Sequence, residues 1–469
     1  MSQLYAKDSL DRFGDDLCEL LLSYLPLEDR FRNECVSKQF QRCVFVTLRD
    51  LIIDEKLMKK MTKKYFPINI MAIIMEKCPN IQHIHCTRIC SPPHDCSQHM
   101  DDQIHHNYHH HRRVHRLVNR MDGNRCPFED KFDVNLMTEF FQTYGSMITK
   151  INFLDTDFKH YLYFCHNLSH LKTQYLSDVL QSGKLLLVRN LKRYEFHMNR
   201  DFNNQMFDTF VANNKSLKSI VVQNIAIRSQ ETVIEFMNKF TELTELQELS
   251  LYFGNKTVRY SLSDCFTEIG LKCKKLKKLC VQMKSNSTEL NVEIFNSIQY
   301  FSGLKRLDLS LNLSIGLIVS NSLQSFDSFK CWPQLTHLCL DLWQMSDKFY
   351  DRIDKMQPKL QHLDTTDPSS QLSGKDFKHI SRLPNLRTLI IRNSNKNKCF
   401  DPIFLNVLAL KCAKIMSIEI WLKAGQTHGL NERMIESIKK TYQMRLNKRS
   451  LMSNTSNHFI DSPEEVAHN

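Results

Sequence analysis

Residues 304–309 read Leu-Lys-Arg-Leu-Asp-Leu, and this spacing of apolar residues recurs along most of the chain. Each copy, called a hexamer here, has an apolar residue, two others, a second apolar residue, one other and a third apolar residue. Twelve hexamers begin at Ile81, Ile148, Leu168, Leu191, Leu217, Leu246, Leu276, Leu304, Leu335, Leu360, Leu386 and Ile415. From Ile148 onward their starting points are 20 to 31 residues apart. A period in this range indicates a chain of stacked structural repeats.

Each hexamer has the pattern of a short β-strand, because its last two apolar residues are two positions apart and face the same side. Segments with helical periodicity lie between hexamers, at 232–243, 292–301, 346–356 and 402–412. Each repeat is therefore predicted to be a strand followed by a helix. One repeat buries too little apolar surface to fold alone, so the strands should stack into a curved parallel sheet with a concave binding face.

A second pattern precedes the hexamers. Apolar residues with helical spacing occur at Leu17, Leu20, Leu21, Tyr24 and Leu25. Pro26 should end this helix, because the residue before a proline avoids the helical conformation. Glu28 and Asp29 suit the start of a second helix, where negative charge complements the helix dipole. An apolar stripe then continues through Phe31, Cys35, Val36 and Phe40, which predicts a compact helical unit.

This unit resembles an F-box, a helical module of about 35 residues here. The resemblance is carried by an acidic residue before Leu17, the SYLPLEDR turn at 23–30, and Val36-Ser37-Lys38-Gln39-Phe40 in place of the family's Val-Cys-Lys-x-Trp/Phe. The family usually opens with Leu-Pro-x-Glu-Leu, where this chain has Phe13-Gly14-Asp15-Asp16-Leu17. Cys or Pro also precedes several hexamers, as in CPNI, CHNL, CKKL, CWPQL, LPNL and CAKI. This is similar to the cysteine-containing leucine-rich repeats that commonly follow an F-box.

The expected fold class is therefore α/β: an amino-terminal three-helix F-box followed by a curved leucine-rich-repeat solenoid of about 12 strand–helix repeats, with the parallel sheet on the concave face. The expected boundaries are 10–50 for the F-box, 51–77 for a basic helical linker, 78–446 for the solenoid and 447–469 for a polar tail. A helical segment at 431–446 should cap the solenoid. A His-rich insertion at 91–126 is expected to be disordered.

The resemblance implies a substrate-recognition subunit of a Skp-cullin-F-box ubiquitin ligase, without catalytic residues, cofactor or metal of its own. The F-box would bind a Skp-family adaptor, and through it a cullin-RING ligase, while the repeats hold a protein substrate. The implied adaptor-binding or supporting residues are Leu17, Leu20, Leu21, Tyr24, Leu25, Pro26, Val36 and Phe40. Two alternatives stay open: a leucine-rich-repeat scaffold with a degenerate F-box that promotes no ubiquitylation, and a helical cap in place of the F-box.

The expected substrate-binding residues lie two, four or six positions after the start of a hexamer, where side chains point away from the core. They are Arg193, Glu195, Tyr252, Lys278, Arg306, Asp308, His337, Asp341, Asp364, Arg392, Glu419 and Trp421. With Lys150, Lys172 and Glu248 on the same face, the charges number six basic and six acidic. A neutral face argues against nucleic acid, which binds clustered basic side chains, and favours a mixed protein interface.

The composition sets the remaining expectations. The chain has 469 residues, a net charge of +12 and 16 cysteines. Neither an amino-terminal apolar leader nor a membrane-spanning apolar run is visible, which favours the cytoplasm or nucleus, reduced thiols and no membrane partner. Zinc bound by Cys86, Cys90, Cys96 and His99 is a weaker alternative, because these spacings match no paired knuckle. An enzyme is disfavoured because the sequence contains no glycine-rich nucleotide motif, phosphate loop or His-Glu-x-x-His.

Overall fold

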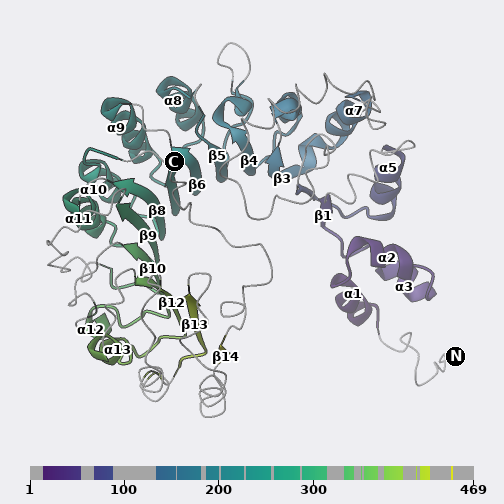
Figure 1. Cartoon of the computed structure of the whole chain (residues 1–469). Helices are drawn as coiled ribbons and strands as arrows, with labels where there is room; N and C mark the ends of the chain where they lie inside the picture. Colours follow the sequence, from purple (N-terminus) through teal and green to yellow (C-terminus); the bar gives the residue numbers. More distant parts are fainter. Residues whose placement is uncertain are drawn as a thin grey trace, which may run out of the picture. The chain divides into compact units, whose positions relative to one another are not determined.

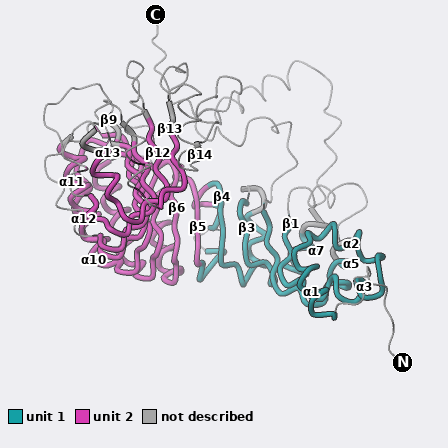
Figure 2. The backbone as a smooth tube through the Cα atoms, turned by 90° about the horizontal axis from the view of Figure 1, so that it is seen from below, with its two compact units in different colours: residues 1–95, 107–174, 178–191 teal, residues 96–106, 175–177, 192–469 magenta. Residues whose placement is uncertain are grey.

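The computed structural model describes residues 14–53, 68–87, 134–154, 156–180, 186–199, 202–225, 229–254, 258–285, 288–313, 332–342, 350, 353–367, 374–393, 408, 412, 414–422 and 445–446. The chain forms two compact units, which are coloured separately in Figure 2. Unit 1 comprises residues 1–95, 107–174 and 178–191, and unit 2 comprises residues 96–106, 175–177 and 192–469.

Unit 1 begins with three helices and continues with strands that alternate with helices. The three helices are α1 (Asp15–Ser23), α2 (Leu27–Asn33) and α3 (Lys38–Cys43). The following elements are β1 (Asp50–Ile53), α5 (Ile68–Lys77), β2 (His83–Cys86), α7 (Val134–Tyr144), the short 3₁₀ helix η2 (Gly145–Met147), β3 (Ile148–Leu154), η3 (Thr156–Phe164) and β4 (His170–Tyr175). Each of these strands pairs in parallel with the next, in chain order. The 3₁₀ helix η4 (Leu176–Val179) follows β4.

Unit 2 repeats the strand–helix alternation. Its strands are β5 (Arg193–His197), β6 (Ser219–Ile225), β7 (Glu248–Phe253), β8 (Lys278–Ser285), β9 (Arg306–Leu313), β10 (His337–Leu342), β11 (His362–Asp367), β12 (Thr388–Asn393), β13 (Ser417–Leu422) and β14 (Arg445–Leu446). Neighbouring strands pair in parallel in chain order.

Helices lie along one side of these strands (Figure 1). They are α8 (Asn204–Asn213), α9 (Gln230–Lys239), η5 (Phe240–Glu242), α10 (Ser263–Lys272), α11 (Thr288–Ser297), η6 (Ile298–Tyr300), α12 (Ile353–Met356) and α13 (Gly374–Ile380). The face of the strands that points away from the helices is called the inner face here. The α/β class and the parallel sheet predicted from the hexamers are therefore present.

All twelve hexamers coincide with strands, from β2 to β13. Most of their apolar residues are buried, as Leu304, Leu307 and Leu309 illustrate with at most 1% of each exposed. One strand was missed: Leu48–Ile53 has the same apolar spacing and contains β1, although residues 51–77 were expected to be a helical linker. The helix predicted over 431–446 is wrong at its end, where Arg445–Leu446 is a strand. Residues 423–444 lie outside the described residues.

In four repeats the residue three positions before the hexamer is a cysteine, namely Cys78, Cys165, Cys273 and Cys412, while Pro79, Pro333 and Pro384 occupy the following position in other copies or the same one. The residue three positions before the hexamer is buried, and in several repeats its side chain donates to a carbonyl group near the end of the helix of the preceding repeat. Cys273 Sγ donates to the carbonyl oxygen of Phe240 at 3.3 Å, and Trp332 Nε1 donates to that of Ile298 at 3.1 Å. Cys412 Sγ donates to Ser381 O at 3.4 Å. Since the last carbonyls of a helix have no partner within the helix, a donor here satisfies them and ties successive repeats together.

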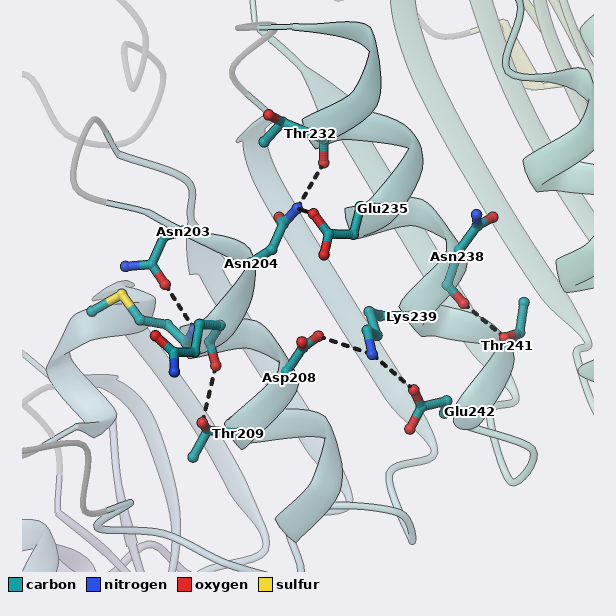
Figure 3. Close-up of polar contacts among 12 residues, drawn as sticks. Asn203, Asn204, Asp208, Thr209, Thr232, Glu235, Asn238, Lys239, Thr241 and Glu242 are labelled. Atoms are coloured by element: carbon teal, nitrogen blue, oxygen red, sulfur yellow. Dashed lines mark hydrogen bonds and ion pairs between the residues drawn. The ribbon is translucent and has the colours of Figure 1, made fainter.

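The helices of neighbouring repeats are also joined by polar contacts on the outer surface (Figure 3). Lys239 of α9 lies 3.2 Å from Asp208 of α8 and 3.2 Å from Glu242. Hydrogen bonds from Lys215 and Lys239 hold the pKa of Glu242 below its usual value. Exposed pairs such as these contribute little stability each, so the buried apolar residues provide most of the cohesion between repeats.

None of the described helices combines the length and hydropathy needed to cross a membrane.

Candidate functional site

The three amino-terminal helices have a small core and a separate exposed apolar face. Their buried apolar residues include Cys18 and Leu22 of α1 and Cys43, Val44 and Phe45 at the end of α3. The apolar α1 face consists of side chains that are 41 to 80% exposed, namely Leu17, Leu20, Leu21 and Tyr24. Because this spacing of three, one and three residues lies along one side of a helix, these side chains form a continuous stripe opposite the core.

The other predicted adaptor residues differ in how far they are exposed. Val36, in the turn between α2 and α3, is 59% exposed, and Pro26 is also exposed. Leu25 and Phe40 are half-buried. The continuous apolar stripe predicted from Phe31 to Phe40 is wrong, because the chain turns there and a new helix begins. Ser37 caps this new helix by accepting a hydrogen bond from the Phe40 amide at 3.1 Å.

A buried arginine holds the three helices together. The Arg30 side chain donates four hydrogen bonds: to the carbonyl oxygens of Ser23 (3.0 Å), Leu25 (2.9 Å) and Val44 (2.7 Å), and to the Thr47 hydroxyl (2.9 Å). These partners lie at the end of α1 or just after it and after α3, so a single side chain on α2 connects the ends of the other two helices. Burial lowers the pKa of Arg30. No pattern in the sequence indicates this role.

Further contacts fix the orientation of α1 and attach the helices to the first strands. Asp15 accepts from Gln39 at 3.0 Å and from Arg42 at 3.3 Å, which joins α1 to α3 and lowers the pKa of Asp15. Lys77 at the end of α5 pairs with Glu34 and lies 5.7 Å from the centre of the Phe45 ring. The apolar α1 face is therefore held on a fixed support.

The inner face carries most of the predicted substrate residues in aligned rows. Pairing places Lys278, Arg306, His337 and His362 side by side on β8 to β11. A second row, two residues further along the strands, contains Asp308, Cys339, Asp364 and Glu419. A third row, another two residues along, contains Ser310, Asp341, Arg392 and the backbone of Trp421. Arg193 and Glu195 lie on β5 and Tyr252 on β7. The Trp421 side chain lies outside the described residues.

Two of these carboxylates are covered by arginines. Arg306 Nε donates to Asp308 Oδ2 at 2.8 Å, and Arg392 binds Asp364 through two hydrogen bonds of 2.9 and 2.7 Å. The Asp364 side chain is 7% exposed and that of Asp308 is 17% exposed, whereas about half of each arginine faces outward, at 47% and 49%. Asp364 therefore holds Arg392 in place, and its predicted role in substrate binding stays a prediction.

The remaining predicted residues have local partners. Asp341 accepts from the Ser310 hydroxyl at 2.9 Å, and Arg193 lies 3.4 Å from Glu248. The Tyr252 hydroxyl accepts from Cys280 Sγ at 3.3 Å, and burial raises the pKa of Tyr252.

Two inner-face residues were missed because the prediction selected mainly charged side chains. The His362 ring stacks on that of His337, with centroids 5.5 Å apart, and Cys339 lies beside Asp364. Both could have been found from the repeat, since they occupy the outward positions of their hexamers.

Burial disfavours the thiolate form of several described cysteines. Burial raises the pKa of Cys86 to about 12 and also raises that of Cys339. A reactive cysteine needs a lowered pKa instead. Among the described ranges, no three His, Cys, Asp or Glu side chains are placed to hold a metal ion. Of the alternative zinc ligands, only Cys86 is described, and Cys90, Cys96 and His99 lie outside.

No protein-family model matches the chain, and no curated protein matches it. Its function is therefore inferred from the apolar α1 face and the inner face of the sheet.

Proposed function

We propose that the chain is the substrate-recognition subunit of a cullin-RING ubiquitin ligase of the Skp-cullin-F-box type. The helices α1 to α3 act as the F-box and bind a Skp-family adaptor. The strand–helix repeats act as a leucine-rich-repeat receptor for a protein substrate. One observation carries the proposal: the residues assigned to the adaptor from the F-box resemblance include an exposed apolar stripe that the core of the helical unit does not use.

An exposed stripe of this kind favours a protein partner. Burying one large apolar side chain contributes about 1.5 to 3 kcal/mol. The apolar α1 face has three leucines and a tyrosine, and tyrosine is among the residues that dominate binding energy at interfaces. The Arg30 hydrogen bonds and the Asp15 contacts support the stripe from behind, so little ordering cost remains when a partner binds.

The proposal assigns no bond-making step to this chain. A receptor that holds a substrate beside a ubiquitin-loaded enzyme raises the effective concentration of the substrate's lysines at the reacting thioester. The raised pKa values of the buried Cys86 and Cys273 fit such a positioning role. The mixed and paired charges of the inner face fit a protein substrate.

The test is co-purification of the full chain with a Skp-family adaptor and a cullin. The test variant carries Leu20→Asp and Tyr24→Ala on the apolar α1 face. The matched control carries Leu271→Asp and Tyr163→Ala, which change the same residue types at other exposed positions, 44% and 62% exposed. We expect the wild type and the control to retain adaptor and cullin, and the test variant to lose both.

Two outcomes would contradict the proposal. If the wild type binds no adaptor, the helical unit is a cap on a scaffold that promotes no ubiquitylation. If the test variant binds as well as the wild type, the apolar α1 face is not the adaptor site. Circular dichroism of each variant checks that a loss of binding does not reflect unfolding.

A further inference from the structure

Four basic or protonatable side chains occupy one row of the inner face. Lys278, Arg306, His337 and His362 are aligned on the consecutive strands β8, β9, β10 and β11, and this set is called the cationic row. Neighbouring strands lie about 4.8 Å apart, so the row is about 14 Å long. The acidic residue Glu248 occupies the same row only on the preceding strand, β7, where Arg193 and Ser219 contact it.

The exposed groups around this row are more positive than the sequence suggests. Counting residues gives equal numbers of acids and bases on the inner face, but the two kinds differ in exposure. Asp308 and Asp364 lie beneath Arg306 and Arg392, whose outer halves remain exposed. At these two pairs, an approaching molecule therefore meets a guanidinium group before it meets a carboxylate.

The cationic row also has unused hydrogen-bond donors. Arg306 uses Nε for Asp308, and its two terminal amino groups have no hydrogen-bond or ion-pair partner in the part of the chain that the structure describes. The same holds for the Lys278 ammonium group. A guanidinium fixed through Nε presents its remaining donors in one plane, which suits a carboxylate.

We infer that the cationic row binds an acidic segment of a protein, an extended stretch with Asp or Glu at alternate positions. This inference rests on the proposed function, because it names the class of substrate that the repeats hold. Alternate side chains of an extended chain lie about 6.6 Å apart, so three of them span about 13 Å. That span matches the length of the cationic row.

The surrounding acids disfavour a polyphosphate. Asp308 and Asp341 lie in the two rows beyond Arg306, and Glu248 lies at one end of the cationic row. A nucleic acid carries continuous negative charge and needs a surface that is basic throughout. Single carboxylates at alternate positions can pair with the cationic row without lying close to these acidic side chains.

The two histidines should make binding depend on pH. Burial, the neighbouring Arg306 and, for His337, the facing His362 lower the pKa of these rings. Asp308 acts on both rings in the opposite direction, as do Asp364 and Glu419 on His362. Thr336 contacts the Nδ1 atom of His337. A bound carboxylate favours the protonated rings, so an acidic segment should bind more tightly as the pH falls.

The test measures binding of a fluorescein-labelled peptide, Gly-Glu-Ser-Glu-Ser-Glu-Gly, to the full chain by fluorescence anisotropy. Parallel probes replace each Glu by Lys or by phosphoserine, or use a short single-stranded RNA. The test variant is Lys278→Gln with Arg306→Gln. Its matched control is Lys277→Gln with Lys305→Gln, which removes the same charge from exposed residues one position earlier in the chain.

We expect the glutamate peptide to bind the wild type and the control with affinities within about twofold, and the test variant at least about tenfold more weakly. Equal weakening in the control, no binding of the glutamate peptide, or tighter binding of the lysine, phosphoserine or RNA probe would each overturn the inference. The Leu20→Asp, Tyr24→Ala variant should still bind the glutamate peptide. Loss of adaptor by this variant with retained peptide binding would support both proposals, whereas a wild type that binds the glutamate peptide but no adaptor would contradict the proposed function alone.

Discussion

The apolar α1 face and the inner face of the sheet expose opposite kinds of side chain above similar apolar cores. The apolar α1 face exposes three leucines and a tyrosine, and the only buried charge among the described residues of the three helices is Arg30. On β8 to β12 the exposed residues are charged and partly paired with one another. An apolar stripe gains free energy whenever a partner covers it, whereas paired charges contribute selectivity more than affinity. The apolar α1 face therefore suits tight binding of a partner, and the inner face suits discrimination between partners.

The largest expected difference is in stability, between a leucine-to-aspartate change in the core of the sheet and the same change on the apolar α1 face. Leu307→Asp buries a charge at a position that is fully covered, and we expect a loss of stability on the order of 5 kcal/mol or more. Leu20→Asp, at a side chain 55% exposed, should cost less than about 1 kcal/mol. Urea denaturation followed by circular dichroism measures both. Similar losses would mean that Leu20 belongs to a core.

Arg30→Met tests the support of the apolar α1 face. The change leaves three carbonyl oxygens and the Thr47 hydroxyl without their donor, which should destabilise the three helices by about 3 to 5 kcal/mol. Hydrogen exchange should rise over 14–47. Arg32→Met is the control, because Arg32 is exposed and pairs only with Asp29. Unchanged exchange in the Arg30 variant would contradict the assigned role.

Arg392→Leu removes the partner of a covered carboxylate on the inner face. We expect a loss of about 2 to 4 kcal/mol, because Asp364 would keep its charge with little access to water. The comparison is Arg193→Leu, whose partner Glu248 is 38% exposed, and this variant should lose less than about 1 kcal/mol. Thermal melts of the two variants distinguish the pairs. Equal losses of stability would mean that the exposure of the carboxylate does not determine how much each ion pair contributes.

The smallest expected effect is the pH dependence contributed by His337 and His362. Their pKa values are lowered from 6.5, so between the lowered and the ordinary values the folded chain binds fewer protons than the unfolded chain. This contribution to stability is complete above about pH 6.5 and is lost as the pH falls through the lowered values. The urea midpoint should therefore fall more on acidification in the wild type than in His337→Gln, His362→Gln. If the urea midpoints of the two proteins fall in parallel as the pH is lowered, the histidines do not contribute this pH dependence.

Much of the sheet could be predicted because its information is periodic and local. Each hexamer specifies a strand by the spacing of three residues, and β1 was missed because residues 51–77 were interpreted as a basic helical linker. The exposed and buried sides of α1 could not be separated in advance, since Cys18 and Leu22 alternate with the exposed leucines along the same apolar helix. Arg30 could not be predicted either, because its hydrogen bonds join carbonyl groups that only the folded chain brings together.

The cysteines three residues before the hexamers can serve as probes for local opening between neighbouring repeats. Cys273 and Cys412 each donate a hydrogen bond into the preceding repeat, and burial raises the pKa of both to about 11. An alkylating reagent reaches such a thiol only when the boundary between two repeats opens. The rate of alkylation at each cysteine would then measure how often one boundary opens. Comparing these rates along the chain would show which repeats open first.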